Sequence, residues 1–418
     1  MEKSLLLKNV IVDGKQTNVL INGNQYTDLH APADQTADEV LDSKGTQALV
    51  PAFYNMHTHA AMTLLRGYAD DKELFDWLNN YIWPAEAKLT ADDIYWGTKL
   101  AILEMLRSGT VFMNDMYWHQ TAVIKAAEEM NFRAAVGYMY ICVPGGGVSE
   151  SNRRANDELH EYVPQISDRI IITYAPHAIY TVNKKTLLEI REKAVAEKAI
   201  LHIHAAETKK EVVDCVKEHG LTPVAYLHKL GLLSPQTLLA HGVYLTDDEL
   251  QMVHASGAVL IHNPVSNMKL CSGLFRFQDA VNRKCRVVLG TDGCSSNNNA
   301  SMLEEMKFAA LSAKLQSGSP IAGKDEDVYR MATQAGAEAM GLNAGVIAEG
   351  KLADGLLIDL NSPQMVGDYS LIANLVYAAD SSVIDTVICN GKIVMKDKYV
   401  PGQEEIIEKC KNICHKLK

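Results

Sequence analysis

The chain is poor in positive charge: 40 lysines and arginines stand against 51 aspartates and glutamates, which gives a net charge of −11. An acidic surface repels phosphate backbones and anionic lipids, so this balance argues against nucleic-acid and membrane-surface partners, and ordinary solubility explains it. The sequence also lacks an apolar run long enough to span a membrane, and its N-terminus carries no long signal-peptide segment. We therefore expect a cytoplasmic protein.

Paired cysteine spacing is absent as well. The eight cysteines are scattered, which is typical of reduced, mostly buried thiols in a cytoplasmic enzyme. Cys410, Cys414 and His415 cluster near the C-terminus, but the same spacing places them on one face of a helix. We prefer a helix over residues 401–418 to a metal site there.

What the sequence does contain is a long alternation of short apolar segments with helical stretches, from about residue 51 to about residue 345. One strand candidate leads into His57. Seven more follow at residues 110–116, 133–139, 170–175, 199–204, 237–241, 258–263 and 286–292. Eight strand–helix repeats predict an α/β fold with a closed parallel (β/α)8 barrel of the TIM type.

Both ends of the chain contain further strand signals. Apolar segments flank turn residues within residues 4–50, and strand–turn–strand patterns return at 352–359 and 385–396. The simplest arrangement is a small β-sandwich built from both termini, with the barrel inserted between them. We therefore expect a composite sandwich of residues 1–50 and 349–400, a barrel of residues 51–348 and a C-terminal helix.

Four metal-binding side chains stand at strand ends, which is where barrels of this kind place their active sites. His57 and His59 follow the first strand, His204 closes the fifth and Asp292 follows the eighth. Because side chains alternate faces along a strand, the two histidines of His-Thr-His point the same way, although an isolated His-x-His is also met by chance in loops. Three imidazoles and one carboxylate suit zinc or ferrous iron with a position open for water.

Other polar residues at the strand ends indicate catalysis. Glu207 lies three residues beyond His204, where a carboxylate can move a proton to a substrate ring nitrogen, although a glutamate at a helix N-terminus is the alternative explanation. Asp292 can also accept a proton from the metal's water, and His241 can orient that water. His202 shares the face of its strand with the ligand two residues later, and we interpret it as a packing or supporting residue.

At this level of detail the motifs resemble a known family. The resemblance is to the amidohydrolase superfamily, and within it to the branch of 5′-methylthioadenosine/S-adenosylhomocysteine deaminases and triazine chlorohydrolases. It covers essentially the whole chain and rests on the segments PAFYNMHTHAAMTLLRGYADD, APHAIYT, HIHAAET, LAHGVYL, HNPVSNMKLCSG and GTDGCSSNN.

The resemblance implies roles for individual residues. It implies that His57, His59, His204 and Asp292 bind the metal, that Glu207 carries the proton and that His241 orients the attacking hydroxide. It further implies that Glu86, in Trp-Pro-Ala-Glu, binds the ribose hydroxyls, and that the substrate contacts His177, Glu207 and Asp292. Binuclear relatives bridge two metals with a lysine on the fourth strand. That strand has no lysine here, so we expect one divalent ion, most simply Zn²⁺, with Fe²⁺ or Mn²⁺ as alternatives.

The region after the third strand departs from the family pattern. Deaminases that accept S-adenosylhomocysteine offer arginines there to the amino-acid carboxylate, but no arginine lies between Arg133 and Arg153 in this chain. Arg153 or Arg154 could substitute, and the Gly-rich loop before them leaves the alignment open.

Three functions remain in competition. The first is a metal-dependent aminohydrolase that releases ammonia from an aminated purine nucleoside such as 5′-methylthioadenosine, adenosine or S-adenosylhomocysteine. The second uses the same site on another N-heterocycle, such as guanine, a pterin or a triazine, with an amine or chloride leaving group. The third is a non-catalytic metal-binding protein, against which the presence of Glu207 and His241 argues. We expect a small-molecule substrate and a homo-oligomer, dimer or tetramer.

Overall fold

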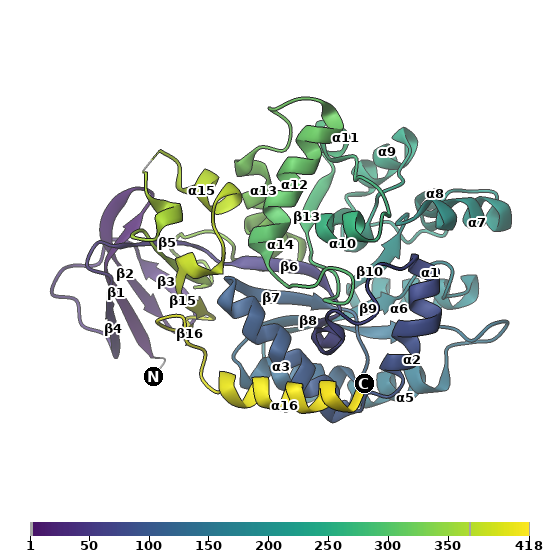
Figure 1. The fold of residues 1–418 in the computed structure, drawn as a ribbon, viewed down its shortest axis with the longest axis horizontal. Coiled ribbons are helices and arrows are strands. Elements are labelled where there is room, and N and C mark those ends of the chain that lie inside the picture. The colour runs from purple at the N-terminus through teal and green to yellow at the C-terminus, as the bar shows by residue number, and fades with distance from the viewer. Residues whose placement is uncertain (1–2, 368, 418) are drawn as a thin grey trace.

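The computed structural model describes residues 3–367 and 369–417 of the chain. Its strands form two sheets, which Figure 1 shows next to each other: a barrel surrounded by helices, and a second sheet made from the two ends of the chain. No helix in the described part of the chain combines the length and apolar character that a membrane span requires.

Eight strands make up the barrel, and each pairs in parallel with the next along the sequence. They are β6 (Phe53–Thr58), β7 (Thr110–Asp115), β8 (Arg133–Tyr140), β9 (Ile170–Pro176), β10 (Ile200–Ala205), β11 (Thr237–His241), β12 (Val259–His262) and β13 (Arg286–Leu289). The chain just after β13 closes the ring, because the N–H of Asp292 donates to the carbonyl of His57 at 2.9 Å. The predicted (β/α)8 barrel is confirmed.

The barrel strands are apolar runs because helices cover their outer side and the packed interior covers the other. Between β6 and β7 lie η1 (Ala60–Leu65), α1 (Leu74–Trp77), η2 (Leu78–Ile82), α2 (Trp83–Glu86) and α3 (Ala91–Arg107). The remaining connections carry α4 (Gln120–Glu129), α5 (Glu150–Tyr162), η3 (Val163–Gln165), α6 (Lys184–Glu197), α7 (Lys209–His219), α8 (Pro223–Lys229), α9 (Asp247–Ser256), α10 (Pro264–Lys269) and α11 (Phe277–Asn282). After β13 follow α12 (Met302–Ser317), α13 (Asp325–Ala332) and α14 (Gln334–Ala339).

Side-chain caps fix where several of these helices begin. Thr90 and Asp93 form a capping box at α3, and Thr246 and Glu249 form another at α9. Thr208 caps α7 by accepting the backbone N–H of Glu211. These caps fix the residue at which each helix begins, and so they limit the movement of the strand-end residues before α7 and α9.

The second sheet contains strands from both ends of the chain in the order β16-β15-β14-β5-β1-β2-β3, with β4 paired to β1. Its strands are β1 (Ser4–Val12), β2 (Lys15–Asn22), β3 (Gln25–Asp28), β4 (Glu39–Asp42), β5 (Gln47–Pro51), β14 (Gly355–Asp359), β15 (Ile384–Cys389) and β16 (Lys392–Met395). The apolar run before His57 is therefore divided at Ala52: its first half, β5, joins this sheet and the rest, β6, enters the barrel. One small apolar core takes residues from β1 to β5 and from β14 and β15. The division into domains at residues 50 and 348 stays a prediction.

The chain ends beyond this sheet. It passes through η4 (Pro363–Met365), α15 (Leu371–Tyr377) and η5 (Ser381–Val383) and ends in α16 (Gln403–Leu417), which runs along α3 (Figure 1). Cys410 on α16 is buried and donates to the carbonyl of Trp96 on α3 at 3.2 Å. Its thiol thus faces a packed helix.

Candidate active site

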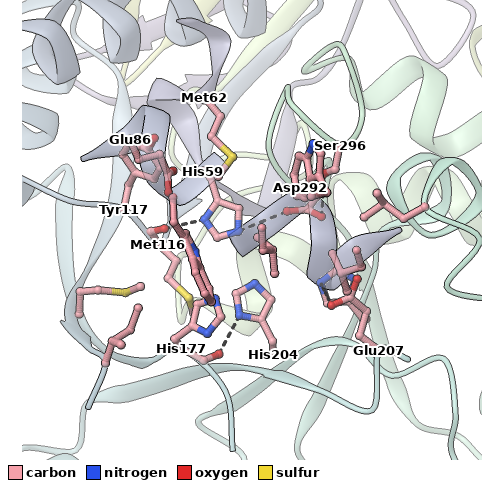
Figure 2. Close-up of a pocket in the computed structure, with 18 of the residues that line it drawn as sticks. His59, Met62, Glu86, Met116, Tyr117, His177, His204, Glu207, Asp292 and Ser296 are labelled. Carbon is pink, nitrogen blue, oxygen red and sulfur yellow. Dashed lines mark hydrogen bonds and ion pairs between the residues drawn. The ribbon is translucent and has the colours of Figure 1, made fainter. Parts of the chain in front are cut away.

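The polar residues predicted from the strand ends lie together at one mouth of the barrel. Figure 2 shows His59, His204 and Asp292 around a common pocket, with Glu86 and Glu207 on its two sides. β6 supplies His57 and leads into His59, β10 supplies His204, and the loop after β13 supplies Asp292. Parallel strands bring these positions together because their carboxyl ends share one edge of the sheet.

Backbone carbonyls orient two of the histidine rings. The Nδ1 of His59 lies 2.6 Å from the carbonyl oxygen of Met116, and the Nδ1 of His204 lies 2.7 Å from that of His177. A carbonyl only accepts, so each Nδ1 carries a hydrogen, and Nε2 is the nitrogen left to bind a metal ion in place of a proton. Both rings therefore present the nitrogen that a metal ion needs.

Asp292 joins the paired histidines. Its Oδ1 lies 3.4 Å from the Nε2 of His57 and 3.3 Å from the Nε2 of His59. Ligands held about 2.0–2.1 Å from one tetrahedral zinc ion lie about 3.4 Å apart, so these spacings suit a shared ion. The hydroxyls of Ser266 and Ser296 donate to Oδ2 at 2.6 and 3.1 Å, which fixes the carboxylate.

The described residues contain two groups whose ligand atoms lie within 4.8 Å of one another, and both include His57. One joins His57 to His59 and Asp292, and the other joins it to His204 and His241. The Nε2 of His57 is buried and has no hydrogen-bond partner among the described residues, which is costly unless another partner completes it. The donor set and this nitrogen fit a divalent cation.

Burial and the negative charge of Asp292 act in opposite directions on the pKa values of the paired histidines. Burial lowers the pKa of His57 to about 4, although Asp292 opposes this shift. Burial acts on His59 in the same direction, but hydrogen bonding and the charge of Asp292 outweigh it and raise its pKa to about 9. Burial also opposes ionisation of Asp292, yet the two histidines hold its pKa well below the usual value. A cation bound here would be stabilised by the same carboxylate.

His241 and Asp292 have backbone conformations that residues other than glycine rarely adopt. Their φ angles are +74° and +62°, in the left-handed region that favours glycine. Such strain persists only where the surroundings enforce it, and it is found most often at functional sites. The Nδ1 of His241 lies 2.8 Å from Asn267 Oδ1, so this amide oxygen accepts its hydrogen and leaves Nε2 to face the pocket.

Glu207 lies against His241 on one side of the pocket. Its Oε2 is 3.8 Å from the His241 Nε2, and Ser272 donates to its Oε1 at 3.2 Å. The side chain is buried, and this burial raises its pKa above the ordinary glutamate value. A buried carboxyl with a raised pKa can hold a proton and release it to a substrate.

Glu86, which the sequence would have left on the surface, is buried at the end of α2 with 8% of its area exposed. Burial raises its pKa, while Tyr117 and Trp118 oppose the shift. One of its oxygens, Oε1, has no hydrogen-bond partner among the described residues. An unpaired carboxylate oxygen that lines the pocket can accept hydroxyl donors from a ligand.

The other two histidines differ in position. His177 lines the pocket, and its Nδ1 lies 2.9 Å from the hydroxyl of Thr181. His202 lies behind the ligands, with its Nε2 3.0 Å from the Nδ1 of His57 and its Nδ1 3.1 Å from Asn114 Nδ2. Its position agrees with the supporting role expected from its place in the strand.

Several residues of the site were not identified from the sequence. Ser266 and Asn267 follow β12, and Ser296 follows Asp292 by four residues. Polar residues directly after a barrel strand were the available signal in Asn-Pro-Val-Ser-Asn and Asp-Gly-Cys-Ser-Ser. Ser266 and Asn267 lie on α10, and they contact Asp292 and His241 on other segments of the chain, which spacing along the sequence does not reveal.

The sequence matches the model of the amidohydrolase family over residues 48–394. The chain belongs to the amidohydrolase family. This confirms the resemblance drawn from the motifs.

Relatives within this family are similar over most of their length. The 5-methylthioadenosine/S-adenosylhomocysteine deaminase 1 of Archaeoglobus fulgidus is 43% identical over an alignment of 425 positions, gaps included, that covers 99% of each chain. The 5′-deoxyadenosine deaminase of Methanospirillum hungatei is 45% identical over 373 residues, 89% of this chain and 83% of that one. The crystal structure of an adenosine deaminase from Xanthomonas campestris with bound zinc has a TM-score of 0.92 at 30% identity and covers 99% of this amidohydrolase and 98% of its own chain.

Proposed function

We propose that this amidohydrolase is a metal-dependent deaminase that releases ammonia from an adenine nucleoside. The observation that carries the proposal is the position of Glu207 and His241 beside the histidine–aspartate group. A metal that only stabilised the fold would need neither side chain at its open side. The relatives described above, at 30–45% identity, are named as deaminases of adenosine or its derivatives, and these names favour this substrate class over guanine, pterins or triazines.

His57, His59, His204 and Asp292 would hold one divalent ion, most simply zinc, with iron or manganese as alternatives. The ring orientations and the spacings of about 3.4 Å support this set. His241 also lies within reach of His57 and His204, but we assign it to the water because its Nε2 also faces Glu207. The ion, when bound, lowers the pKa of a water molecule toward neutrality and so makes it nucleophilic.

The side chains then divide the proton transfers between them. His241 accepts a hydrogen bond from the attacking water and directs it to the ring carbon that bears the amine. Asp292 would take a proton from the water, and Glu207 would give one to the adjacent ring nitrogen. The new C–O bond would form at that carbon, and Asp292 would pass the proton it took to the departing amine, so that the C–N bond breaks and ammonia leaves. The proton of the new hydroxyl group would return to Glu207 and leave the oxo product behind.

Glu86 and His177 would bind the rest of the nucleoside. A carboxylate can accept hydrogen bonds from both ribose hydroxyls, and the unpaired oxygen of Glu86 is available for them. His177 lines the same pocket from the end of β9 and would contact the substrate there.

A second cavity of about 500 Å³ adjoins the pocket, and we name it the outer cavity. The two share the residues Trp83, Glu86, Trp118 and Ile141. Among the described residues that line the outer cavity there is no lysine or arginine, and Glu86 is its charged group. Arg154 on α5 forms an ion pair with Glu150 and is 78% exposed.

A substrate carboxylate in the outer cavity would therefore lose contacts with water without gaining a cationic partner. An apolar 5′ group, such as a methylthio or methyl group, matches the tryptophan and isoleucine walls instead. We therefore propose 5′-methylthioadenosine, 5′-deoxyadenosine or adenosine as better substrates than S-adenosylhomocysteine. We also propose a cytoplasmic homo-oligomer, because scattered cysteines suit a reducing compartment and barrels of this branch commonly pair through strand-end loops.

The test is a screen of the purified protein for ammonia release. The panel holds adenine nucleosides, S-adenosylhomocysteine, guanine, a pterin and a triazine. Ammonia from the adenine nucleosides at a kcat/KM at least tenfold above that for the other ring systems supports the proposal. Ammonia release from guanine or a triazine alone would contradict the proposal and favour a hydrolase of another N-heterocycle.

A further inference from the structure

Glu211 is a buried carboxylate that the proposed reaction does not use. It lies in the first turn of α7, four residues beyond Glu207, and only 4% of it is exposed. Its Oε1 accepts the backbone N–H of Ala206 at 2.9 Å, and its Oε2 accepts that of Glu207 at 2.8 Å. The two oxygens of one carboxyl group thus accept the N–H groups of two consecutive residues.

The turn held in this way has a strained backbone. Ala206 has a φ of +54°, in the left-handed region where the β-carbon crowds the following carbonyl. This conformation turns the chain between the end of β10, which carries His204, and the N-terminus of α7. A strained residue keeps its conformation only while its neighbours hold it.

The carbonyl groups of the turn are held from another loop. The carbonyl of Ala205 accepts the N–H of Gly242 at 3.0 Å, and that of Ala206 accepts the N–H of Tyr244 at 2.9 Å. The chain that leaves His241 is therefore tied to the chain that leaves His204. Every polar backbone group of this buried turn depends on a partner, and Glu211 supplies the partner for two donors in succession.

We propose that Glu211 is a positioning residue that fixes Glu207 relative to His204 and His241 by clamping the turn between them. The inference rests on the proposed role of Glu207 as the proton carrier. With the clamp, Glu207 Oε2 stays 3.8 Å from His241 Nε2. Without it, two buried N–H groups lose their acceptor, the left-handed turn relaxes, and Glu207 leaves the position from which it reaches the ring.

The first test is Glu211→Gln, which keeps the shape of the side chain but has one acceptor oxygen and places an NH₂ against the other backbone donor. We expect kcat to fall about 10- to 100-fold, as for other residues that orient a catalytic group, with KM changed less than about threefold and metal content unchanged. Glu218→Gln is the matched control, because Glu218 lies on the same helix with its side chain 76% exposed, and it should keep the wild-type kcat. A kcat for Glu211→Gln within about twofold of wild type would overturn the proposal.

The second test measures the clamp itself and requires no substrate. Hydrogen exchange of the peptide that spans residues 205–210 should accelerate by at least one amide in Glu211→Gln, whose side chain keeps a single acceptor oxygen, and stay unchanged in Glu218→Gln. Protection that persists at both amides would contradict the clamp even if kcat fell. If the wild-type protein deaminated no nucleoside, the proposed function would fail, while the exchange experiment would still decide whether the clamp exists.

The third test is a rescue. Glycine adopts a left-handed φ without strain, so Ala206→Gly should reduce the need for the clamp. We expect kcat of the double variant Ala206→Gly/Glu211→Gln to be at least about threefold higher than that of Glu211→Gln alone. If Glu211→Gln cannot be purified, Glu211→Asp, which retains the charge but is one methylene shorter, takes its place in the same comparison. If Ala206→Gly lowered kcat further in Glu211→Gln or in Glu211→Asp, the proposal that Glu211 acts by holding the strained turn would be contradicted.

Discussion

The surroundings of Glu207 suit proton transfer better than a structural role at the start of α7. It is buried, it receives a hydrogen bond from Ser272, and it lies beside His241. Burial raises its pKa, so the proton it must deliver is held more firmly than by an exposed glutamate. A glutamate whose role was to begin α7 would instead be expected in solvent at the helix end.

The Glu207→Gln substitution tests this role. The amide can still accept a hydrogen bond but cannot deliver a proton, so kcat should fall by roughly 10²–10⁴. Metal content measured by elemental analysis should stay at the wild-type level, because Glu207 is not among the proposed ligands. Near-normal turnover would return Glu207 to the role of a helix-terminal charge.

Glu86 provides the corresponding test on the substrate side. Loss of the carboxylate should raise KM for adenosine or 5′-methylthioadenosine, since two ribose hydroxyls lose their acceptor, while the kinetics with the free base adenine should change little. The measurement is a comparison of KM for nucleoside and base in wild type and Glu86→Ala. Equal changes for both compounds would mean that the pocket does not bind ribose through this residue.

At the scale of the secondary-structure elements, the barrel strands and the polar residues at their ends could be predicted from the sequence, because both follow from local periodicity. The barrel strands are short apolar runs, and the histidines and aspartate that follow them could be placed at one edge because parallel strands end together. Glu86 could not be placed in this way. It lies on a short helix in a long connection, and only the packing of that connection over the barrel mouth buries it.

The contacts that side chains of α10 and α7 make with the site were equally out of reach. Ser266 meets Asp292 across 26 residues, and Glu211 meets the turn before its own helix through side-chain geometry rather than spacing. Each of these contacts satisfies a buried polar group, and the need for a partner does not reveal which residue supplies it. The position of Arg154 was also open in the sequence, and the structure places it in solvent.

Helix α5 forms one wall of the outer cavity through Ser151 and Ala155, and this leads to a prediction about specificity. Ala155→Arg would supply the missing cation, so kcat/KM for S-adenosylhomocysteine relative to 5′-methylthioadenosine should rise at least tenfold, about 1.4 kcal/mol in transition-state binding. The control is Ala155→Leu, which adds volume without charge and should produce no such gain.

The kcat/KM values of the wild-type protein for the same two substrates test whether the outer cavity lacks a cation. The wild-type protein should prefer 5′-methylthioadenosine to S-adenosylhomocysteine. A wild-type preference of about tenfold or more for S-adenosylhomocysteine would mean that a cation reaches its carboxylate after all, from Arg153, Arg154 or a partner chain.

At the scale of the whole molecule, a buried ion pair joins the barrel to the terminal sheet. Arg133 at the start of β8 donates to Asp354 Oδ2 at 2.9 Å, and Tyr54 on β6 donates to the same oxygen at 2.7 Å. The other oxygen, Oδ1, accepts the N–H of Asn390 beyond β15 at 2.7 Å. Three segments far apart in the sequence thus converge on one carboxylate, which no local pattern predicts.

Asp354→Asn should therefore destabilise the entire protein. The arginine would remain buried without its counter-charge, and breaking such a pair costs about 3–5 kcal/mol in the free energy of unfolding. Urea unfolding followed by circular dichroism measures it. Arg154→Gln is the control, because its partner Glu150 is exposed and the unfolding midpoint should not move. An unchanged midpoint for Asp354→Asn would show that the barrel and the terminal sheet do not depend on this contact.

The central claim, a deaminase with one metal ion per chain, is tested most directly by titration of metal-free protein with zinc. The measurement is the initial rate of ammonia release from 5′-methylthioadenosine at each ratio of zinc to protein. The account predicts negligible release without metal, a linear rise and a plateau that begins at one equivalent. Full activity without metal, a plateau that begins only at two equivalents, or no ammonia at any ratio would contradict it.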